Sequence, residues 1–538
     1  MATATEPGLD SSHANDPGMP SIQQNRGLRF WGTFVCLCIL AFISALDVAV
    51  ITIALPTITN EIGGAHQYIW IANSFVVASS VLQPLIGQLA DAFGRRTPLI
   101  SSVVAFALGS GLAGSAYNAA MLIAGRTIQG VGAGGIYILL DIVCCDLVPL
   151  RERGKYLGLM FSWSGVAAAL GPPVGGALAE ANWRWIFYMN LPICGVALGG
   201  LLLFMQVRSG ATNANELGIM AKLGRLDIIG NVIFTPSMIS LLIGLIGGGT
   251  QHPWSSWRII LPLLLGIIGW ISFHILQFFV EYPSVPPCLF SNRTSATAFL
   301  LTFTSSVLLQ VLSYFLPIYF QAVKHTTVLR SGILFLPFAL GALVFAVVAG
   351  TLLSKFGKYR PLHALAFALA SVAFGLFTLL GPNTPEFAYV LFELIASAGM
   401  GMIMSVLLPA IMAPLPEKYV ASSSATYSFV RTFGYIWGIT IPGLIFNAVF
   451  NHHLPTISDP TVQSQLRGGA AYAFASQMHA LQNTLSPAVW GEVIAIYVKS
   501  LKAIWWVCLG ISLLSFFTVA LEREVKLREE LDTEYGLD

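Results

Sequence analysis

Apolar stretches long enough to cross a bilayer recur along the whole chain, and this feature limits the fold more than any other. A helical stretch of about 18 or more apolar residues spans a hydrocarbon core of roughly 30 Å. The chain has 538 residues, whereas a single soluble core stops growing at about 250–300 residues. The pattern therefore predicts an all-α polytopic membrane protein of about fourteen spans, and twelve spans also fit it.

The composition agrees with a membrane protein. Hydrophobic residues make up 56% of the chain and charged residues 10%, against about 45–50% and 25% in soluble globular proteins. A net charge of +2 offers no basic surface for nucleic acid. Nearly all seven cysteines lie in apolar runs without CxxC spacing, so we expect buried thiols, no disulfide and no metal site. No cofactor is expected.

The distribution of Lys and Arg predicts the orientation. With the N-terminus in the cytoplasm, most of the 27 Lys and Arg residues fall on inner segments, as the positive-inside rule requires. Both termini are therefore expected inside, which needs an even number of spans. The one N-glycosylation sequon, at Asn292, falls on an inner segment and should stay unmodified.

Two inner loops share a sequence pattern at a constant offset of 263 residues. Gly87, Leu89, Asp91, Gly94, Arg95 and Pro98 align with Gly350, Leu352, Ser354, Gly357, Lys358 and Pro361. Either a six-helix unit is duplicated or Gly and Leu match by chance; duplication is the usual build of secondary transporters, whose substrate site lies between the halves.

The duplication predicts a simple domain order. Residues 1–28 form a disordered cytoplasmic tail, 29–206 a six-helix bundle, 207–226 a cytoplasmic linker, 227–281 two additional helices, 294–521 a second six-helix bundle with an outer loop at 451–491, and 522–538 a cytoplasmic tail.

Four motifs resemble those of the major facilitator superfamily, specifically its fourteen-span drug:proton antiporter group as found in fungi. They are Gly87–Arg96 (GQLADAFGRR), Leu46–Pro56 (LDVAVITIALP), Arg126–Gly134 (RTIQGVGAG) and Gly171–Gly176 (GPPVGG). The last resembles the antiporter motif of helix 5, although Ala167 stands where that pattern tends to have Gly. The resemblance implies two six-helix bundles with two additional central helices, and export of small molecules against protons.

Asp47 and Arg126 are the candidates for proton coupling, since an ionisable side chain within a span costs at least about 2.5–3.5 kcal/mol. Each lies about 10 Å from the outer end of its predicted helix at 1.5 Å per residue, so the two can meet. Burial raises the pKa of a carboxyl and a guanidinium lowers it, so separating the pair would switch its proton affinity. The alternative is a static ion pair that fixes the first predicted helix (residues 31–55) against the fourth (residues 119–143).

The loop motif predicts a conformational latch. Gly87 and Gly94 permit close approach and a tight turn, Asp91 can cap a helix, and Arg95 can pair with an acid of helix 4, for which Asp141 and Asp146 are both candidates. Arg96 belongs to the same motif, whose alternative role is positive-inside anchoring.

In the fifth predicted helix (residues 156–178), the residues Gly171, Pro172, Gly175 and Gly176 allow either a kink together with close packing, or close packing alone.

Candidate cavity residues follow from their position and polarity. Gln310 stands where the repeat places the counterpart of Asp47, and it cannot titrate. The full set comprises Trp70, Asn73, Gln129, Gln310, Tyr314, Gln321, Glu393 and Arg431. The loop at 451–491 either covers the outer mouth or is disordered.

The favoured function is a proton-coupled exporter of amphipathic drugs, toxins or secondary metabolites, working by alternating access. The alternatives are an importer of an iron chelate or nutrient with the same fold, and a transporter-like sensor. An enzyme is disfavoured, because the sequence has no HExxH, GxSxG or GxxxxGK[ST] motif. The expected partners are small molecules, protons and the bilayer, with a monomeric chain in the plasma membrane or, alternatively, the vacuolar membrane.

Overall fold

The protein is helical throughout the part that its computed structural model describes, which comprises residues 27–62, 68–205, 224, 226–248, 252–467, 471, 474–475, 478 and 485–527. No strand occurs within these ranges, and the all-α membrane architecture is confirmed. The predicted tails at 1–28 and 522–538 and the linker at 207–226 lie largely outside the described residues.

The first half contains the helices α1 (Leu28–Ile62), α2 (Tyr68–Val81), α3 (Gln83–Phe93), α4 (Arg96–Gly114), α5 (Ala119–Leu147), α6 (Leu150–Asn182), α7 (Trp185–Tyr188) and α8 (Asn190–Phe204). The segments α2 and α3 meet at an angle of 44° and form one bent span. Gly94 ends α3 with φ +80°, a conformation that glycine adopts without steric cost.

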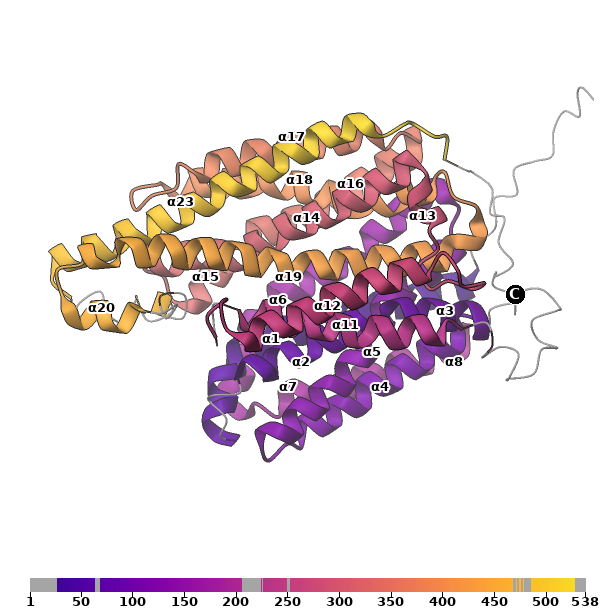
Figure 1. Cartoon of the computed structure of the whole chain (residues 1–538), viewed down its shortest axis with the longest axis horizontal. Coiled ribbons are helices and arrows are strands. Elements are labelled where there is room, and N and C mark those ends of the chain that lie inside the picture. Colours follow the sequence, from indigo (N-terminus) through magenta and orange to yellow (C-terminus); the bar gives the residue numbers. More distant parts are fainter. Residues whose placement is uncertain are drawn as a thin grey trace, which may run out of the picture.

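Two central helices follow, α11 (Ile228–Gly247) and α12 (Trp257–Leu276), and then the second half. Its elements are α13 (Cys288–Ser291), α14 (Arg293–Ile318), η2 (Tyr319–Val323), α15 (Val328–Leu334), α16 (Leu336–Phe356), α17 (Arg360–Phe377), α18 (Glu386–Met412), η3 (Glu417–Tyr419), α19 (Val420–His453), η4 (Leu454–Thr456), α20 (Pro460–Leu466), α23 (Pro487–Thr518) and η7 (Val519–Leu521). Figure 1 shows these long helices running side by side along the long axis of the molecule.

The span count is compatible with fourteen. Among the described residues, twelve helices are long and apolar enough to cross a membrane, and the bent pair α2–α3 makes thirteen. The remaining long helix, α6, is less apolar but has 33 residues, which is more than the about 20 residues that a span needs. Its lower hydropathy fits its position, because α6 packs between α1 and α16.

The two halves meet along α6 with α16 and along α3 and α5 with α19. Glycines of the two repeated loops lie in this interface. A Cβ at Gly87 would lie 2.7 Å from the Cβ of Ala425 on α19, and one at Gly350 would lie 2.2 Å from the carbonyl oxygen of Gly154 on α6. Both repeats therefore use a glycine to bring the opposite half into close contact.

The second repeated loop, like the first, begins with a glycine of positive φ. Gly357 ends α16 with φ +67°, as Gly94 ends α3. A shared interface glycine and a shared helix-ending glycine of positive φ, both at the offset of 263 residues, favour duplication over chance matching of residues.

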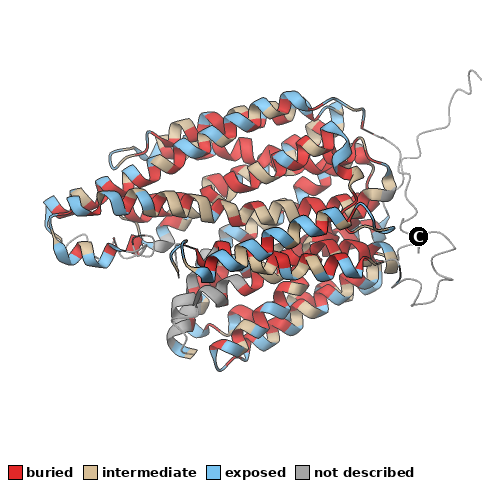
Figure 2. Cartoon of the chain, in the orientation of Figure 1, coloured by how far each residue is buried: buried red, intermediate tan, exposed pale blue. Residues whose placement is uncertain are grey.

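Burial follows the membrane environment. Figure 2 shows buried residues between the helices and exposed ones on their outward faces, and many of the exposed ones are large and apolar, such as Leu264, Ile268 and Ile275 of α12. Such a surface fits lipid. The cysteines are free and buried, except Cys288, which is partly exposed.

The outer segment after α19 is folded where the structure describes it. The backbone N–H and the hydroxyl of Ser458 both donate to Glu492 at the start of α23, at 2.7 Å each, and Val462 and Leu466 of α20 are buried. Residues 451–467 therefore pack on the second half, and disorder is wrong for this part of the predicted loop.

The central pair lies at the seam between the halves. Phe234 and Met238 of α11 pack in one cluster with Val81 of the first half and Ile436 of the second. Helix α11 contacts both α2 and α19.

A buried polar network also ties the pair to the loop motif. Gln88 of α3 accepts a hydrogen bond from the backbone N–H of Asp227 at 3.1 Å, and the Asp227 carboxylate accepts from Gly230 N at 2.7 Å and from Gln277 Nε2 at 2.6 Å. The inserted helices are thus fastened to the first half at its inner end.

We expect Asp227→Ala to lower stability by about 2–4 kcal/mol, because it removes a helix cap and leaves the buried Gln277 amide without its acceptor. The measurement is the melting temperature of the purified protein in detergent. Asp459→Ala is the matched control, since Asp459 caps α20 at an exposed site. Equal losses in both variants would contradict the network's role.

Candidate proton and substrate sites

The expected contact between Asp47 and Arg126 is present. Arg126 Nη1 donates to Asp47 Oδ2 at 2.5 Å, and both side chains are at most 1% exposed. The opposite carboxylate oxygen, Oδ1, accepts from Gln129 Nε2 and from Asn190 Nδ2, each at 2.8 Å. Ser110 Oγ accepts from the same two amides at 2.8 and 3.2 Å. Four helices, α1, α4, α5 and α8, therefore converge on one carboxylate.

The surroundings of the pair explain why both groups can be charged in a low-dielectric site. Three charge-assisted or amide hydrogen bonds replace the lost hydration of Asp47. The Arg126 guanidinium lies 4.3 Å from the ring centroid of Phe75, within reach of a cation–π interaction. Removing either charge would leave the other buried without a counter-ion.

Sequence reasoning missed Asn190 and Ser110. Asn190 follows Asn182–Met189 at the start of α8, and an uncharged amide in a span gives a weak signal. Ser110 lies among small residues of α4 and gives none. Both are fully buried, so only the packing of α8 against α1 and of α4 against α5 and α8 reveals them.

The motif Gly171–Gly176 lies on α6 and packs against α1 directly beside Asp47. A Cβ at Gly171 would lie 2.3 Å from the Cβ of Ala49, and one at Gly175 would lie 2.9 Å from the carbonyl oxygen of Val50. Helix α6 continues without a break through the motif, while the placement of the Pro172 ring and the surroundings of Gly176 fall outside the described residues. Close packing is thus the visible effect of Gly171 and Gly175.

The loop motif forms a buried ion-pair cluster. Arg95 Nε donates to Asp146 Oδ2 at 2.8 Å and Arg95 Nη1 to Asp91 Oδ1 at 2.8 Å. Nη1 also donates to the carbonyl oxygen of Ala90 at 2.6 Å. Arg96 instead donates to the carbonyl oxygen of Leu202 on α8 at 2.9 Å. Asp91 lies inside α3, and Arg95 holds the N-cap position of α4. Asp91 therefore does not cap α4, and it joins the cluster through its ion pair with Arg95.

The prediction that Asp141 pairs with Arg95 is wrong, because Arg95 pairs with Asp146. Asp141 accepts from Ser428 Oγ at 2.9 Å, and its Oδ2 lies 3.9 Å from Arg431 Nη2. Both partners belong to α19 of the second half. Five residues correspond to a rotation of about 140° on a helix, so Asp141 faces the interface of the halves while Asp146 faces Arg95.

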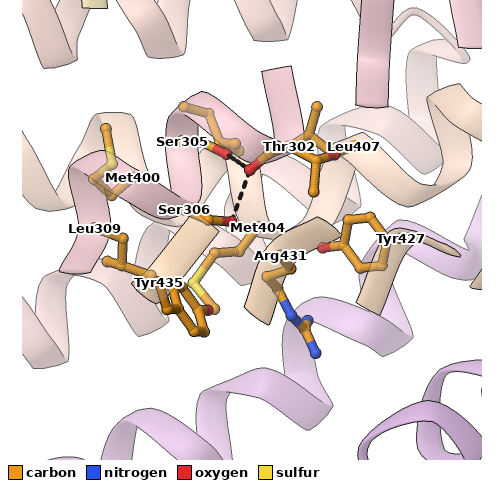
Figure 3. A pocket seen from close by; sticks show the side chains of 11 residues that line it. Thr302, Ser305, Ser306, Leu309, Met400, Met404, Leu407, Tyr427, Arg431 and Tyr435 are labelled. Atoms are coloured by element: carbon orange, nitrogen blue, oxygen red, sulfur yellow. Dashed lines mark hydrogen bonds between the residues drawn. The ribbon is translucent and has the colours of Figure 1, made fainter. Parts of the chain in front are cut away.

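A small pocket lies in the second half between α14, α18 and α19 (Figure 3). It is lined by Thr302, Ser305, Ser306, Leu309, Met400, Ile403, Met404, Leu407, Tyr427, Arg431 and Tyr435. Hydroxyl groups, methionines and two tyrosines give its lining mixed polarity, and in this conformation the hollow is too small to hold a drug-sized molecule. Arg431 lies at the edge toward the first half, with its guanidinium 5.0 Å from the ring centroid of Phe161 on α6.

Among the predicted cavity residues whose side chains the structure describes, Arg431 lines this pocket and the others do not. Gln129 is fully buried in the Asp47 network, and Gln321 is buried and donates to Ser331 Oγ at 2.9 Å. Gln310 and Tyr314 lie on α14 beyond Leu309 and are partly exposed.

Of the remaining predicted cavity residues, only Glu393 has a side chain that the structure describes, and it does not line the pocket. Glu393 is fully buried away from it. The side chains of Trp70 and Asn73 lie outside the described residues.

A second ion pair missed by sequence reasoning links the inner ends of the two halves. Arg153, in the first turn of α6, donates to both carboxylate oxygens of Glu417 in η3 at 3.2 Å, and Arg153 is fully buried. Ser405 of α18 lies behind this pair, against Gly154 and Gly158. This contact joins the two halves at the end that the positive-inside rule predicts to face the cytoplasm.

The chain matches the family model described as Major Facilitator Superfamily over residues 37–439. It is 43% identical over 516 residues to the MFS efflux transporter aclA of Aspergillus oryzae, covering 95% of this chain and 92% of that protein. It is 41% identical over 526 residues to the acurin A biosynthesis cluster MFS-type transporter of Aspergillus aculeatus, covering 97% and 94%. The human organic anion transporter MFSD10 has a similar fold, with a TM-score of 0.53 at 16% identity, covering 91% and 98%.

Neutralising both members of the buried pair should cost less than the sum of the two single losses. We expect Asp47→Asn and Arg126→Gln each to destabilise the protein by about 3–5 kcal/mol, and the double variant to lose less than the sum, because no charge is then left without a counter-ion. Thermal unfolding of the four proteins in detergent gives the coupling energy. Additive losses would show that the two charges do not depend on each other.

Removing Glu417 should open the inner side. In a Ser405→Cys background, Glu417→Ala is expected to speed alkylation of the new thiol several-fold, because the ion pair with Arg153 no longer holds the halves together. The rate is measured by peptide mass after treatment with a membrane-impermeant maleimide. Glu386→Ala is the control, since its exposed pair with Arg330 contributes little. An unchanged rate in Glu417→Ala would exclude this pair as a gate.

Proposed function

Because the chain belongs to the major facilitator superfamily, we propose that it is a proton-coupled efflux transporter that exports amphipathic small molecules, such as drugs, toxins or secondary metabolites. Proton coupling is supported by one observation: the carboxylate of Asp47 is buried in a membrane-spanning helix bundle and is paired with Arg126. The names of the fungal relatives, an efflux transporter and a transporter of a biosynthesis cluster, support the direction and the substrate class.

Proton coupling follows from the competition between a proton and Arg126 for Asp47. In the present conformation the carboxylate is held ionised by Arg126, Gln129 and Asn190. A proton that arrives from outside neutralises Asp47, so the ion pair loses its attraction and the packing of α1 against α5 weakens. Release of this proton inside restores the pair.

Helix α5 connects the proton site with the substrate pocket. It carries Arg126 at the proton site and Asp141 at the interface, where Asp141 contacts Ser428 and Arg431 of α19. Arg431 also lines the pocket. A shift of α5 on protonation therefore changes the position of a charged group at the substrate site, which lets substrate and proton exclude each other.

The glycines of the motif Gly171–Gly176 on α6 support a mechanism in which protons are exchanged for substrate. Gly171 and Gly175 let α6 pack against Ala49 and Val50, two and three residues from Asp47. Helix α6 also forms the interface with α16 and carries Arg153 of the inner gate. One helix thus contacts the surroundings of the proton site, the interface and the gate.

The energy of protons suffices for export. One proton crossing 100 mV releases about 2.3 kcal/mol, and each pH unit adds about 1.4 kcal/mol. We place the protein in the plasma membrane as a monomer. We propose six-helix bundles at 29–206 and 294–521, with the helices of 227–281 between them, and a latch formed by the motif Gly87–Arg96 with Asp146.

The same fold can import, so the direction needs a test of its own. Right-side-out and inside-out vesicles that contain the full chain are compared with ethidium and a panel of mycotoxin-like compounds, with and without a protonophore. Export predicts accumulation only in inside-out vesicles with an acidic lumen. Accumulation only in right-side-out vesicles would indicate an importer.

Asp47→Asn is expected to abolish proton-driven accumulation of ethidium, because an amide cannot carry the proton. The measurement is ethidium fluorescence in inside-out vesicles after an imposed pH gradient, normalised to the amount of folded protein. Glu61→Gln is the control on the same helix, since Glu61 is exposed and accepts from Trp183 at 2.8 Å. Full proton-driven transport by Asp47→Asn would contradict the carrier role.

A further inference from the structure

The second half contains a buried glutamate that has no counter-ion. Glu393 of α18 is fully buried, and neither of its carboxylate oxygens makes a hydrogen bond. It forms no ion pair with any residue that the structure describes. It lies seven residues after the start of α18 at Glu386, about 10 Å into the helix at 1.5 Å per residue.

The groups that face Glu393 are apolar or neutral. From α16 the backbone N–H of Phe338 points toward the carboxylate but is too distant or too poorly aligned for a hydrogen bond, and on α18 itself Tyr389 lies one turn earlier. The described charged side chains of the helices packed on α18 are Arg293 of α14, Glu152, Arg153 and Lys155 of α6, Lys355 of α16, Arg360 of α17, and Arg431 of α19. The other described titratable side chains of these helices are Tyr314 of α14, Tyr156 of α6, His363 of α17, and Tyr427, Tyr435, His452 and His453 of α19. None of them is an ion-pair partner of Glu393.

The repeat shows that this position is special. At the offset of 263 residues, Glu393 is the counterpart of Gly130 and Phe338 that of Phe75. In the first half a Cβ at Gly130 would lie 2.5 Å from the carbonyl oxygen of Phe75. The second half therefore has an acidic side chain at a helix contact where the first half has none.

The ion pair of the first half has no counterpart in the second. Gln310, Tyr389 and Phe392 occupy the positions that correspond to Asp47, Arg126 and Gln129. No guanidinium is therefore positioned to stabilise an ionised Glu393 as Arg126 stabilises Asp47. Because an isolated buried carboxylate costs several kcal/mol, Glu393 carries a proton in this conformation.

We propose that Glu393 is a second proton-carrying group of the transport cycle, protonated in the conformation in which Asp47 is ionised. This rests on the proposed function. The two carboxyl groups sit in different halves and have opposite protonation states, so rocking of the halves can exchange the states. When α16 and α18 separate from their present packing, water reaches Glu393 and the proton leaves.

The first test is labelling of the full-length protein in liposomes with dicyclohexylcarbodiimide, which reacts with protonated carboxyl groups in apolar surroundings. We expect labelling of Glu393 at pH 7, none in Glu393→Gln, and retained labelling in Glu393→Asp. Glu522 is the matched control, because it is equally buried but paired with His363 at 3.0 Å, and it should stay unlabelled. An unlabelled Glu393 would overturn the proposal.

The second test counts protons through the ethidium gradient, with the membrane potential clamped at zero. Each exchanged proton contributes a tenfold gradient per pH unit, so Glu393→Gln should lower the steady-state gradient about tenfold per pH unit. A labelled Glu393 with an unchanged gradient in Glu393→Gln would make it a static neutral group and overturn the proposal. Absence of any proton-driven ethidium transport in the wild type would count against the proposed function instead, while the labelling result stands by itself.

Discussion

The buried ion pair between Asp47 and Arg126 is the interaction on which the first half depends. A charge inside a membrane span is costly unless it is paired. Here the Asp47 carboxylate on α1 accepts hydrogen bonds from side chains of α5 and α8. The pair thereby fixes how three helices pack. Because that packing involves a titratable group, we propose that the arrangement of the bundle depends on protonation.

The contacts between the halves turn this local chemistry into a change of the whole molecule. Helix α5 carries the arginine of the pair and also Asp141, which faces α19. Helix α6 packs beside Asp47 through its glycines and carries in its first turn Arg153, which pairs with Glu417 of the second half. Tightly packed helices move as units and not by gradual deformation, so a change at Asp47 reaches both the pocket and the gate.

The sequence predicts the fold, the repeat and the contact of Asp47 with Arg126, because charged residues in apolar runs are few and must find partners. It does not predict the rotation of each helix about its axis. This explains why Asp141 and Asp146 could not be told apart as partners of Arg95, and why the neutral side chains of Asn190 and Ser110 gave no signal. Arg153 and Glu417 fall at predicted loop ends, where charges also serve as membrane anchors.

The most direct measurement is the distance across the inner end as a function of pH. Spin labels at Thr97 and Lys358, which are exposed on opposite halves, are placed in a background whose native cysteines are replaced by serine or alanine. If protonation of Asp47 weakens its hold on Arg126, acidification should lengthen the distance in the wild type and leave it unchanged in Asp47→Asn. The same pH-dependent lengthening in Asp47→Asn would contradict the coupling.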